Sequence, residues 1–102
     1  MDEQQRVAEF VATNDLDASP EYRLLDLVSE VGELAKDANV STGYGATPDE
    51  LAISEDEVGD ALFALLALAD SLGVDAGDAL ETALAKYENR IGESGEPSSG
   101  ES

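Results

Sequence analysis

Residues 53–70 are ISEDEVGDALFALLALAD, an acidic block followed by nine consecutive apolar residues at 61–69. A helix made of the apolar part is hydrophobic around its whole circumference, so it must be covered on most sides. We therefore expect a buried central helix over 58–72. Because its apolar circumference is too wide for one small chain to cover easily, we expect part of it to face a partner subunit. Glu57 and Asp60 stand at its start, and their i, i+3 spacing places both carboxylates toward one side of the helix.

The composition indicates one small domain and excludes several kinds of site. The chain has 102 residues with 24 acidic and five basic side chains, a net charge of −19, and neither Cys nor His. The charge argues against nucleic acid and anionic membranes as partners. The absence of Cys and His excludes disulfides, thiolate chemistry and His-containing metal sites. Because no signal-like or membrane-spanning segment is evident, we expect a cytoplasmic protein.

The acidic residues are spread over the whole length, which predicts a halophilic protein from a salt-rich cytoplasm. In dilute buffer their mutual repulsion opposes the compact state, whereas at about 1 M salt the screening length falls to roughly 3 Å. We therefore expect stability to increase with salt.

Helix-forming patterns predict an all-α fold with four main helices in one domain over 1–91. The first covers about 3–13, the second begins after Ser19 and runs to about residue 39, and the last opens at Asp75. The start of the central helix stays open, because Thr47 and Ser54 each begin a capping-box pattern. Residues 92–102, GESGEPSSGES, are predicted to be a disordered acidic tail.

The second helix carries four acids at helical spacing beside its apolar face, namely Asp26, Glu30, Glu33 and Asp37. If this helix packs antiparallel to the central one, the pair Glu30 and Glu33 can meet the pair Glu57 and Asp60. Four carboxylates in a partly buried place are costly unless a cation neutralises them. Oxygen ligands alone select hard cations, Mg²⁺ or Mn²⁺, whose usual chemistry is phosphoryl or nucleotidyl transfer.

A structural interpretation of the same acids stays open at this point. An acidic protein exposes acidic helix faces to solvent, and Glu57 three positions after Ser54 can serve as the second member of a capping box. Spacing alone favours this interpretation for the stripe on the second helix.

Four motifs occur in an order that resembles the MazG-like nucleoside triphosphate pyrophosphohydrolases. They are LVSEVGELAKD at 27–37, TGYG at 42–45, EDEVGDALFALLALAD at 55–70 and KYENRI at 86–91. The resemblance spans about 20–91. It implies a four-helix bundle completed by oligomerisation into a homodimer or a dimer of dimers. It also implies Mg²⁺-dependent hydrolysis of NTPs or dNTPs to the monophosphate and pyrophosphate, as in clearance of unwanted nucleotides.

The resemblance also implies roles for particular residues. Glu30, Glu33, Glu57 and Asp60 match the metal ligands, and Glu33 and Glu30 are the candidate catalytic carboxylates, Glu33 being our choice to deprotonate the attacking water. Lys86, Asn89 and Arg90 match side chains that reach triphosphate oxygens. Tyr44 is a candidate contact for the base or ribose. Ser29 stands where the family has a further Glu, which implies fewer ions or weaker metal binding.

Two other functions remain as alternatives. One keeps the fold but changes the substrate to phosphoribosyl-ATP. The other is a catalytically silent acidic helical module that binds a partner and whose acids are caps and solvated faces. The sequence leaves open whether Lys86 and Arg90 act on their own subunit's site or on a neighbour's.

Overall fold

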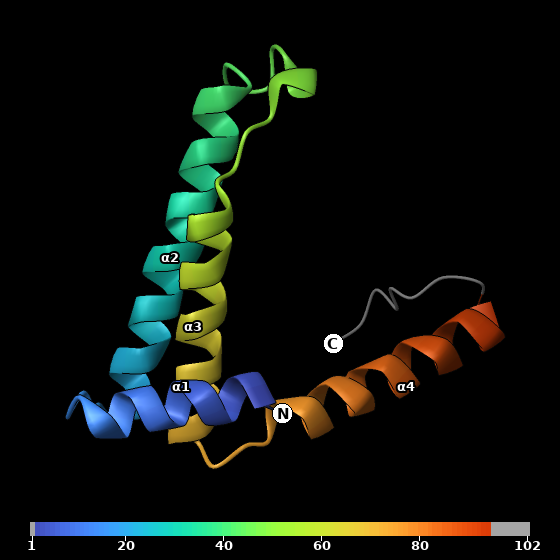
Figure 1. The fold of residues 1–102 in the computed structure, drawn as a ribbon. Coiled ribbons are helices and arrows are strands. Elements are labelled where there is room, and N and C mark those ends of the chain that lie inside the picture. The colour runs from blue at the N-terminus through green and yellow to red at the C-terminus, as the bar shows by residue number, and fades with distance from the viewer. Residues whose placement is uncertain (1, 95–102) are drawn as a thin grey trace.

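The computed structural model describes residues 2–94, which form four α-helices and one 3₁₀ turn (Figure 1). These are α1 (Asp2–Thr13), α2 (Pro20–Ser41), η1 (Pro48–Glu50), α3 (Glu55–Ser71) and α4 (Ala76–Ser94). Residues 2–94 contain no strand, so the all-α prediction is confirmed. Residues 92–94 continue α4 and are not part of a tail as predicted, while the rest of that predicted tail, 95–102, lies outside the described residues.

The helices α2 and α3 pack antiparallel along their length and form a long hairpin (Figure 1). At the end of α2, Gly43 and Tyr44 turn the chain with φ angles of 59° and 58°. The Tyr44 N–H donates to the Asn39 carbonyl at 2.6 Å and the Gly43 N–H to the Val40 carbonyl at 3.2 Å, the pair of bonds that closes a Schellman motif. This turn lets α3 return beside α2.

Ser54, and not Thr47, begins the central helix. The Ser54 hydroxyl accepts a hydrogen bond from the Glu57 N–H at 3.2 Å, as an N-cap should. The Thr47 hydroxyl instead donates to the Thr42 carbonyl at 3.0 Å, so the chain after it forms only the short turn η1. The Glu57 side chain lies beside Asp37 of α2 and does not complete a capping box with Ser54. Its carboxylate therefore contacts another helix and is not only part of a helix cap.

Helix α1 lies across α3 and supplies the remaining packing of the core (Figure 1). The rings of Phe10 and Phe63 meet edge to face, with centroids 5.9 Å apart. The buried apolar residues of the described chain are Val11, Ala64, Leu66, Ala67 and Ala69. On the other sides of α3, Val58 and Leu62 are 53% and 47% exposed. Helix α3 is therefore only partly covered by its own chain, and the burial of its exposed apolar residues against a partner subunit stays a prediction.

Gln4 connects α1 to the link between α3 and α4. Its side-chain amide donates to the Val74 carbonyl at 2.7 Å, and its side-chain oxygen accepts from the Ala76 N–H at 2.6 Å. Asp75 then caps α4 by accepting from the Asp78 N–H at 2.9 Å, which lowers the pKa of Asp75. Both ends of the link are thereby fixed.

Beyond this link, α4 points away from the α2–α3 hairpin (Figure 1). The radius of gyration is 16.6 Å, whereas a compact domain of this size has about 13 Å. A single chain therefore does not close the four helices into a bundle. Completion of the predicted bundle depends on association with another copy of the chain. No helix within 2–94 is both long and apolar enough to span a membrane.

Candidate metal and nucleotide site

Antiparallel packing of α2 and α3 brings acids of the two helices together, as the sequence pattern required. Glu33 and Asp37 of α2 and Asp60 of α3 all act electrostatically on Glu57. The pKa of Glu57 is raised above its ordinary value of 4.5, first by the hydrogen bond that Asp37 shares with it when one of the two is protonated. Burial and the negative charges of Asp37, Glu33 and Asp60 act in the same direction.

Glu57 also has an unsatisfied oxygen. Its Oε2 atom is buried and has no hydrogen-bond partner within 2–94. A buried carboxylate oxygen without a partner is costly, and the neighbouring carboxylates increase that cost because they are also negative. A proton or a cation at this oxygen would remove the cost.

The other two predicted ligands share a hollow of about 350 Å³ one turn further along the helices. Glu30 and Asp60 line it together with Ser29, the residue that departs from the family pattern. Asp60 therefore connects two groups of acids, one with Glu57 and one with Glu30. Glu30 is half-buried, whereas Glu33 and Asp60 are exposed.

The donor set fits a hard cation, although the side chains are not gathered around one point. Within 2–94, no three Asp or Glu side chains converge closely enough to hold one metal ion. The unpartnered Glu57 Oε2, the surrounding carboxylates and the lack of nitrogen or sulfur donors nevertheless fit Mg²⁺ or Mn²⁺, which take oxygen ligands and keep several waters.

The cationic residues predicted for phosphate binding lie on α4, away from these acids (Figure 1). Lys86 and Arg90 flank the Tyr87 ring, with the Lys86 Nζ 5.1 Å and the Arg90 Cζ 5.8 Å from its centroid. Asn89 donates weakly to the Glu93 carboxylate at 3.4 Å. The fold of one chain thus gathers the three residues on one helix but does not bring them to the carboxylates.

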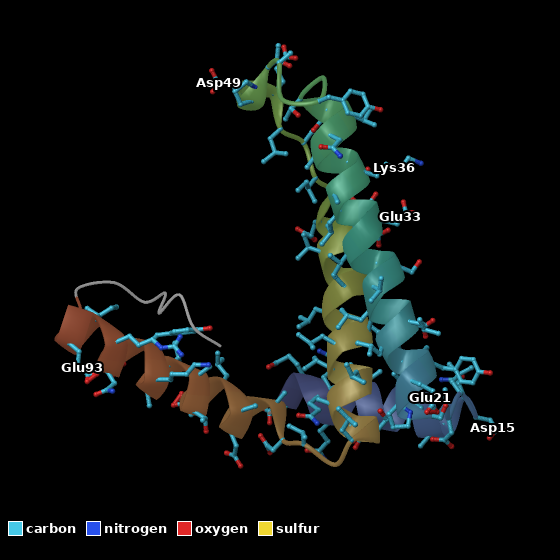
Figure 2. The ribbon with its side chains drawn as sticks, turned by 180° about the vertical axis from the view of Figure 1, so that it is seen from behind. Asp15, Glu21, Glu33, Lys36, Asp49 and Glu93 are labelled. Carbon is cyan, nitrogen blue, oxygen red and sulfur yellow. The ribbon has the colours of Figure 1, made fainter. Side chains whose placement is uncertain are left out.

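Tyr44 lies at the far end of α2, in the turn between α2 and η1. Its side chain is 79% exposed, and its φ of 58° is unusual for a residue with a bulky side chain. Figure 2 shows Glu33 and Lys36 along the outer part of α2, below this turn.

Sequence reasoning missed two residues of the site, Asp37 and Arg23. Asp37 is one of the four acids spaced along the second helix, but it belongs to neither of the two i, i+3 pairs. The spacing therefore predicted no role for it. Arg23 is buried, donates to the Leu16 carbonyl and lines the hollow with Glu30 and Asp60. Its position seven residues before Glu30, on the same helix face, is the signal that could have identified it.

Comparison with known proteins gives the family of this chain. Residues 18–93 match the MazG nucleotide pyrophosphohydrolase domain. The uncharacterized protein YpjD of Bacillus subtilis (strain 168) is 36% identical over 75 residues, which cover 71% of this chain and 67% of that protein. No solved structure matches the chain significantly. The matched region contains α2, α3 and almost all of α4, with every acid described above, and the chain belongs to the MazG nucleotide pyrophosphohydrolase family.

Proposed function

We propose that this chain is a Mg²⁺-dependent nucleoside triphosphate pyrophosphohydrolase that converts NTPs or dNTPs to the monophosphate and pyrophosphate. The observation that carries the proposal is the Glu57 carboxylate, which has a buried oxygen without a partner and three acidic neighbours. Such an arrangement is unfavourable in a protein with only a structural role, and it is relieved by a cation. Membership of the family supplies the reaction class.

The four predicted ligands, Glu30, Glu33, Glu57 and Asp60, would hold the ion between α2 and α3. When bound, Mg²⁺ supplies charge neutralisation for the triphosphate and for the acids themselves. Glu33 is exposed, so it can accept a proton from a water molecule that attacks the phosphate chain, with Glu30 as the second candidate. Ser29 supplies a hydroxyl where the family has a carboxylate, and we expect a site with fewer ions or lower metal affinity.

Lys86, Asn89 and Arg90 would bind phosphate oxygens of the substrate on a second copy of the chain. Within one chain α4 leads these residues away from the carboxylates. Helix α4 also exposes apolar residues, Leu80, Leu84, Tyr87 and Ile91, and α2 exposes Leu24, Val28 and Val31. Packing such faces between copies would bury them and give a homodimer or a dimer of dimers, in which the cations approach a neighbour's acids.

We further propose a cytoplasmic, salt-adapted enzyme that removes unwanted nucleotides. Nucleoside triphosphates and Mg²⁺ are cytoplasmic reactants, and the net charge of −19 suits a salt-rich interior.

The test is pyrophosphate release from a panel of NTPs and dNTPs in molar KCl, with Mg²⁺ or with EDTA. The variants are Asp60→Asn, which removes a ligand charge, and Asp49→Asn, the same chemical change in the exposed turn η1 (Figure 2). We expect release that requires Mg²⁺, falls at least a hundredfold in Asp60→Asn and is unchanged in Asp49→Asn.

The result that contradicts the proposal is a folded protein that releases no pyrophosphate from any of these nucleotides. Hydrolysis of phosphoribosyl-ATP alone would keep the fold and the metal site but change the substrate. No hydrolysis of either class, with no Mg²⁺-dependent gain in thermal stability, would leave the silent helical module as the remaining function.

A further inference from the structure

A second hollow lies between α1 and α3, on the face of α3 next to the carboxylates. It has a volume of about 380 Å³ and is lined mainly by apolar side chains, with Val7 and Phe10 from α1 and Leu62, Phe63 and Leu66 from α3. The size falls within the range of small-molecule sites, about 300 to 1,000 Å³. Helix α1 lies outside the region 18–93 that matches the family, so this wall is a feature of the chain beyond the matched domain.

This α1–α3 groove adjoins the site of the proposed reaction. Phe63 lines both the groove and the hollow that contains Glu30 and Asp60. Gly59, which lines the groove, directly precedes Asp60. Along α3 the distance from Glu57 to Leu66 is about 14 Å at 1.5 Å per residue. An extended nucleoside triphosphate covers a length of this order, so phosphates at the carboxylates would place the base in the groove.

The walls of the groove suit a flat aromatic ligand. Phe10 is 51% exposed although its ring meets Phe63 edge to face, so part of this side chain can contact a ligand. Gly59 contributes no side chain, and a Cβ built there would meet no atom within 4 Å, which leaves the entrance from the Asp60 side open.

Two charged side chains of α1 give the groove both hydrogen-bond donors and hydrogen-bond acceptors. Glu3 and Arg6 line it three positions apart on one side of the helix. Arg6 is one of only five cations in the chain, and a guanidinium has only donors whereas a carboxylate has only acceptors. Together they match a carbonyl oxygen beside a ring N–H, the lactam edge that hypoxanthine, guanine and uracil present and that adenine and cytosine lack.

We propose that the α1–α3 groove binds the base of the nucleoside triphosphate, with Arg6 and Glu3 recognising a lactam edge. This inference rests on the proposed function and adds the class of base to it. Tyr44, at the opposite end of the α2–α3 hairpin, is too far away to contact a base in the groove of its own chain (Figure 1).

The experiment compares bases that differ only in this edge. We would measure kcat/KM for ITP against ATP and for UTP against CTP, in molar KCl with Mg²⁺, for the wild type, Arg6→Gln and Lys36→Gln. Lys36 is exposed on the outer side of α2, so Lys36→Gln removes the same charge outside the groove (Figure 2). We expect the wild type and Lys36→Gln to prefer ITP and UTP about tenfold or more, and Arg6→Gln to lose that preference.

Equal rates for the paired substrates in the wild type, or the same preference in Arg6→Gln, would overturn the proposal while leaving the hydrolase intact. Phe10→Ser addresses the other occupant of such a groove, a helix from a second copy. If Phe10→Ser dissociates the assembly, as seen by sedimentation, and leaves the ratios of substrates unchanged, the groove is a subunit interface and the proposal is wrong.

If no triphosphate is hydrolysed, the proposed function fails and the groove is tested by binding alone. Inosine and adenosine would each be titrated into the protein in molar KCl, and amide NMR shifts of α1 and α3 recorded. Shifts with inosine that disappear in Arg6→Gln support the groove as a base site. The absence of inosine-specific shifts overturns it.

Discussion

The Glu57 carboxylate carries a structural cost in this fold. Its pKa is raised above 4.5, so folding favours its protonated form. The stability that this gives is fully present below pH 4.5 and is lost as the pH rises through the higher pKa of the folded state. Above that pKa the ionised Glu57 destabilises the protein, and a cation at its buried oxygen would remove this cost.

This leads to a prediction for Glu57→Gln. Without metal at pH 7, the variant should unfold at a higher temperature than the wild type, and its advantage should shrink as the pH falls toward 4.5. Adding Mg²⁺ should raise the midpoint of the wild type more than that of the variant, because the variant lacks one ligand charge. Thermal unfolding followed by circular dichroism over pH and Mg²⁺ concentration measures both effects.

The control is Glu81→Gln, an exposed carboxylate on α4. It removes one negative charge from the same protein but should show neither the pH-dependent advantage nor the loss of Mg²⁺ response. Equal behaviour of the two variants would mean that Glu57 contributes only to the net charge, and the metal site would lose its main support.

The approach of acids from α2 and α3 could be predicted from the sequence because the two i, i+3 pairs lie on helices that pack together. The neighbours Asp37 and Arg23 could not, because they depend on how far α2 is shifted along α3. Spacing within each helix does not determine that shift. The unpartnered oxygen of Glu57 is likewise a property of packing, since the sequence allowed the same residue to complete a capping box with Ser54.

At the scale of the helices, Gln4 is the residue that holds α1 to the start of α4. It is 9% exposed, and its amide pairs with both the Val74 carbonyl and the Ala76 N–H. We predict that Gln4→Ala lowers the free energy of unfolding by about 2 to 4 kcal/mol, because it leaves two partly buried backbone groups without partners. Gln5→Ala, an exposed neighbour on the same helix, should cost less than about 0.5 kcal/mol.

Urea unfolding of the two variants in molar KCl measures this difference. Equal free energies of unfolding for Gln4→Ala and Gln5→Ala would contradict this prediction. Water would then replace the two hydrogen bonds at no cost in stability, and Gln4 would not hold α1 to the segment between α3 and α4. Substrate hydrolysis by Gln4→Ala should also weaken, because α1 forms one wall of the proposed base groove.

Most helix ends could be predicted, and the exceptions have local causes. Asp75 caps α4 as expected, and Gly73, with a φ of 70°, ends α3. Thr47 fails as a cap because its hydroxyl closes the preceding turn by bonding to Thr42. The direction of α4 could not be predicted. Its apolar face indicates that the helix packs against something, but not whether the partner is its own chain or another copy.

The high net charge of the whole molecule leads to a prediction about salt. With a net charge of −19 and few buried apolar side chains, repulsion among carboxylates opposes a modest core. We predict that raising KCl from 0.05 to 1 M increases the unfolding midpoint by on the order of 10 °C, as screening shortens to roughly 3 Å.

Repeating the thermal unfolding at both KCl concentrations at pH 4 separates charge screening from the other effects of salt on stability. Many carboxylates are protonated there, so the rise with KCl should be smaller than at pH 7. An equal rise at both pH values would assign the effect to strengthened burial of apolar surface rather than to charge.

Association of whole molecules decides whether the proposed site is complete, and mixed subunits can test it. Asp60→Asn damages the carboxylates on α3, and Arg90→Ala damages the cations on α4; each variant alone should be nearly inactive. If Arg90 acts on the neighbour's site, a mixed dimer has one site with both defects and one intact site. Random mixing makes half of the dimers mixed, so activity should return to about a quarter of the wild type.

If Arg90 acts on its own subunit's site, every site in the mixed dimer keeps one defect and no activity returns. The two variants would be co-expressed with different tags, purified through both, and assayed for pyrophosphate release in molar KCl with Mg²⁺. Doubly tagged dimers contain only mixed pairs, so about half of the wild-type activity is then expected. Inactive doubly tagged dimers would show that α4 must fold back onto its own α2–α3 hairpin during the reaction, because the described chain holds it away from the acids.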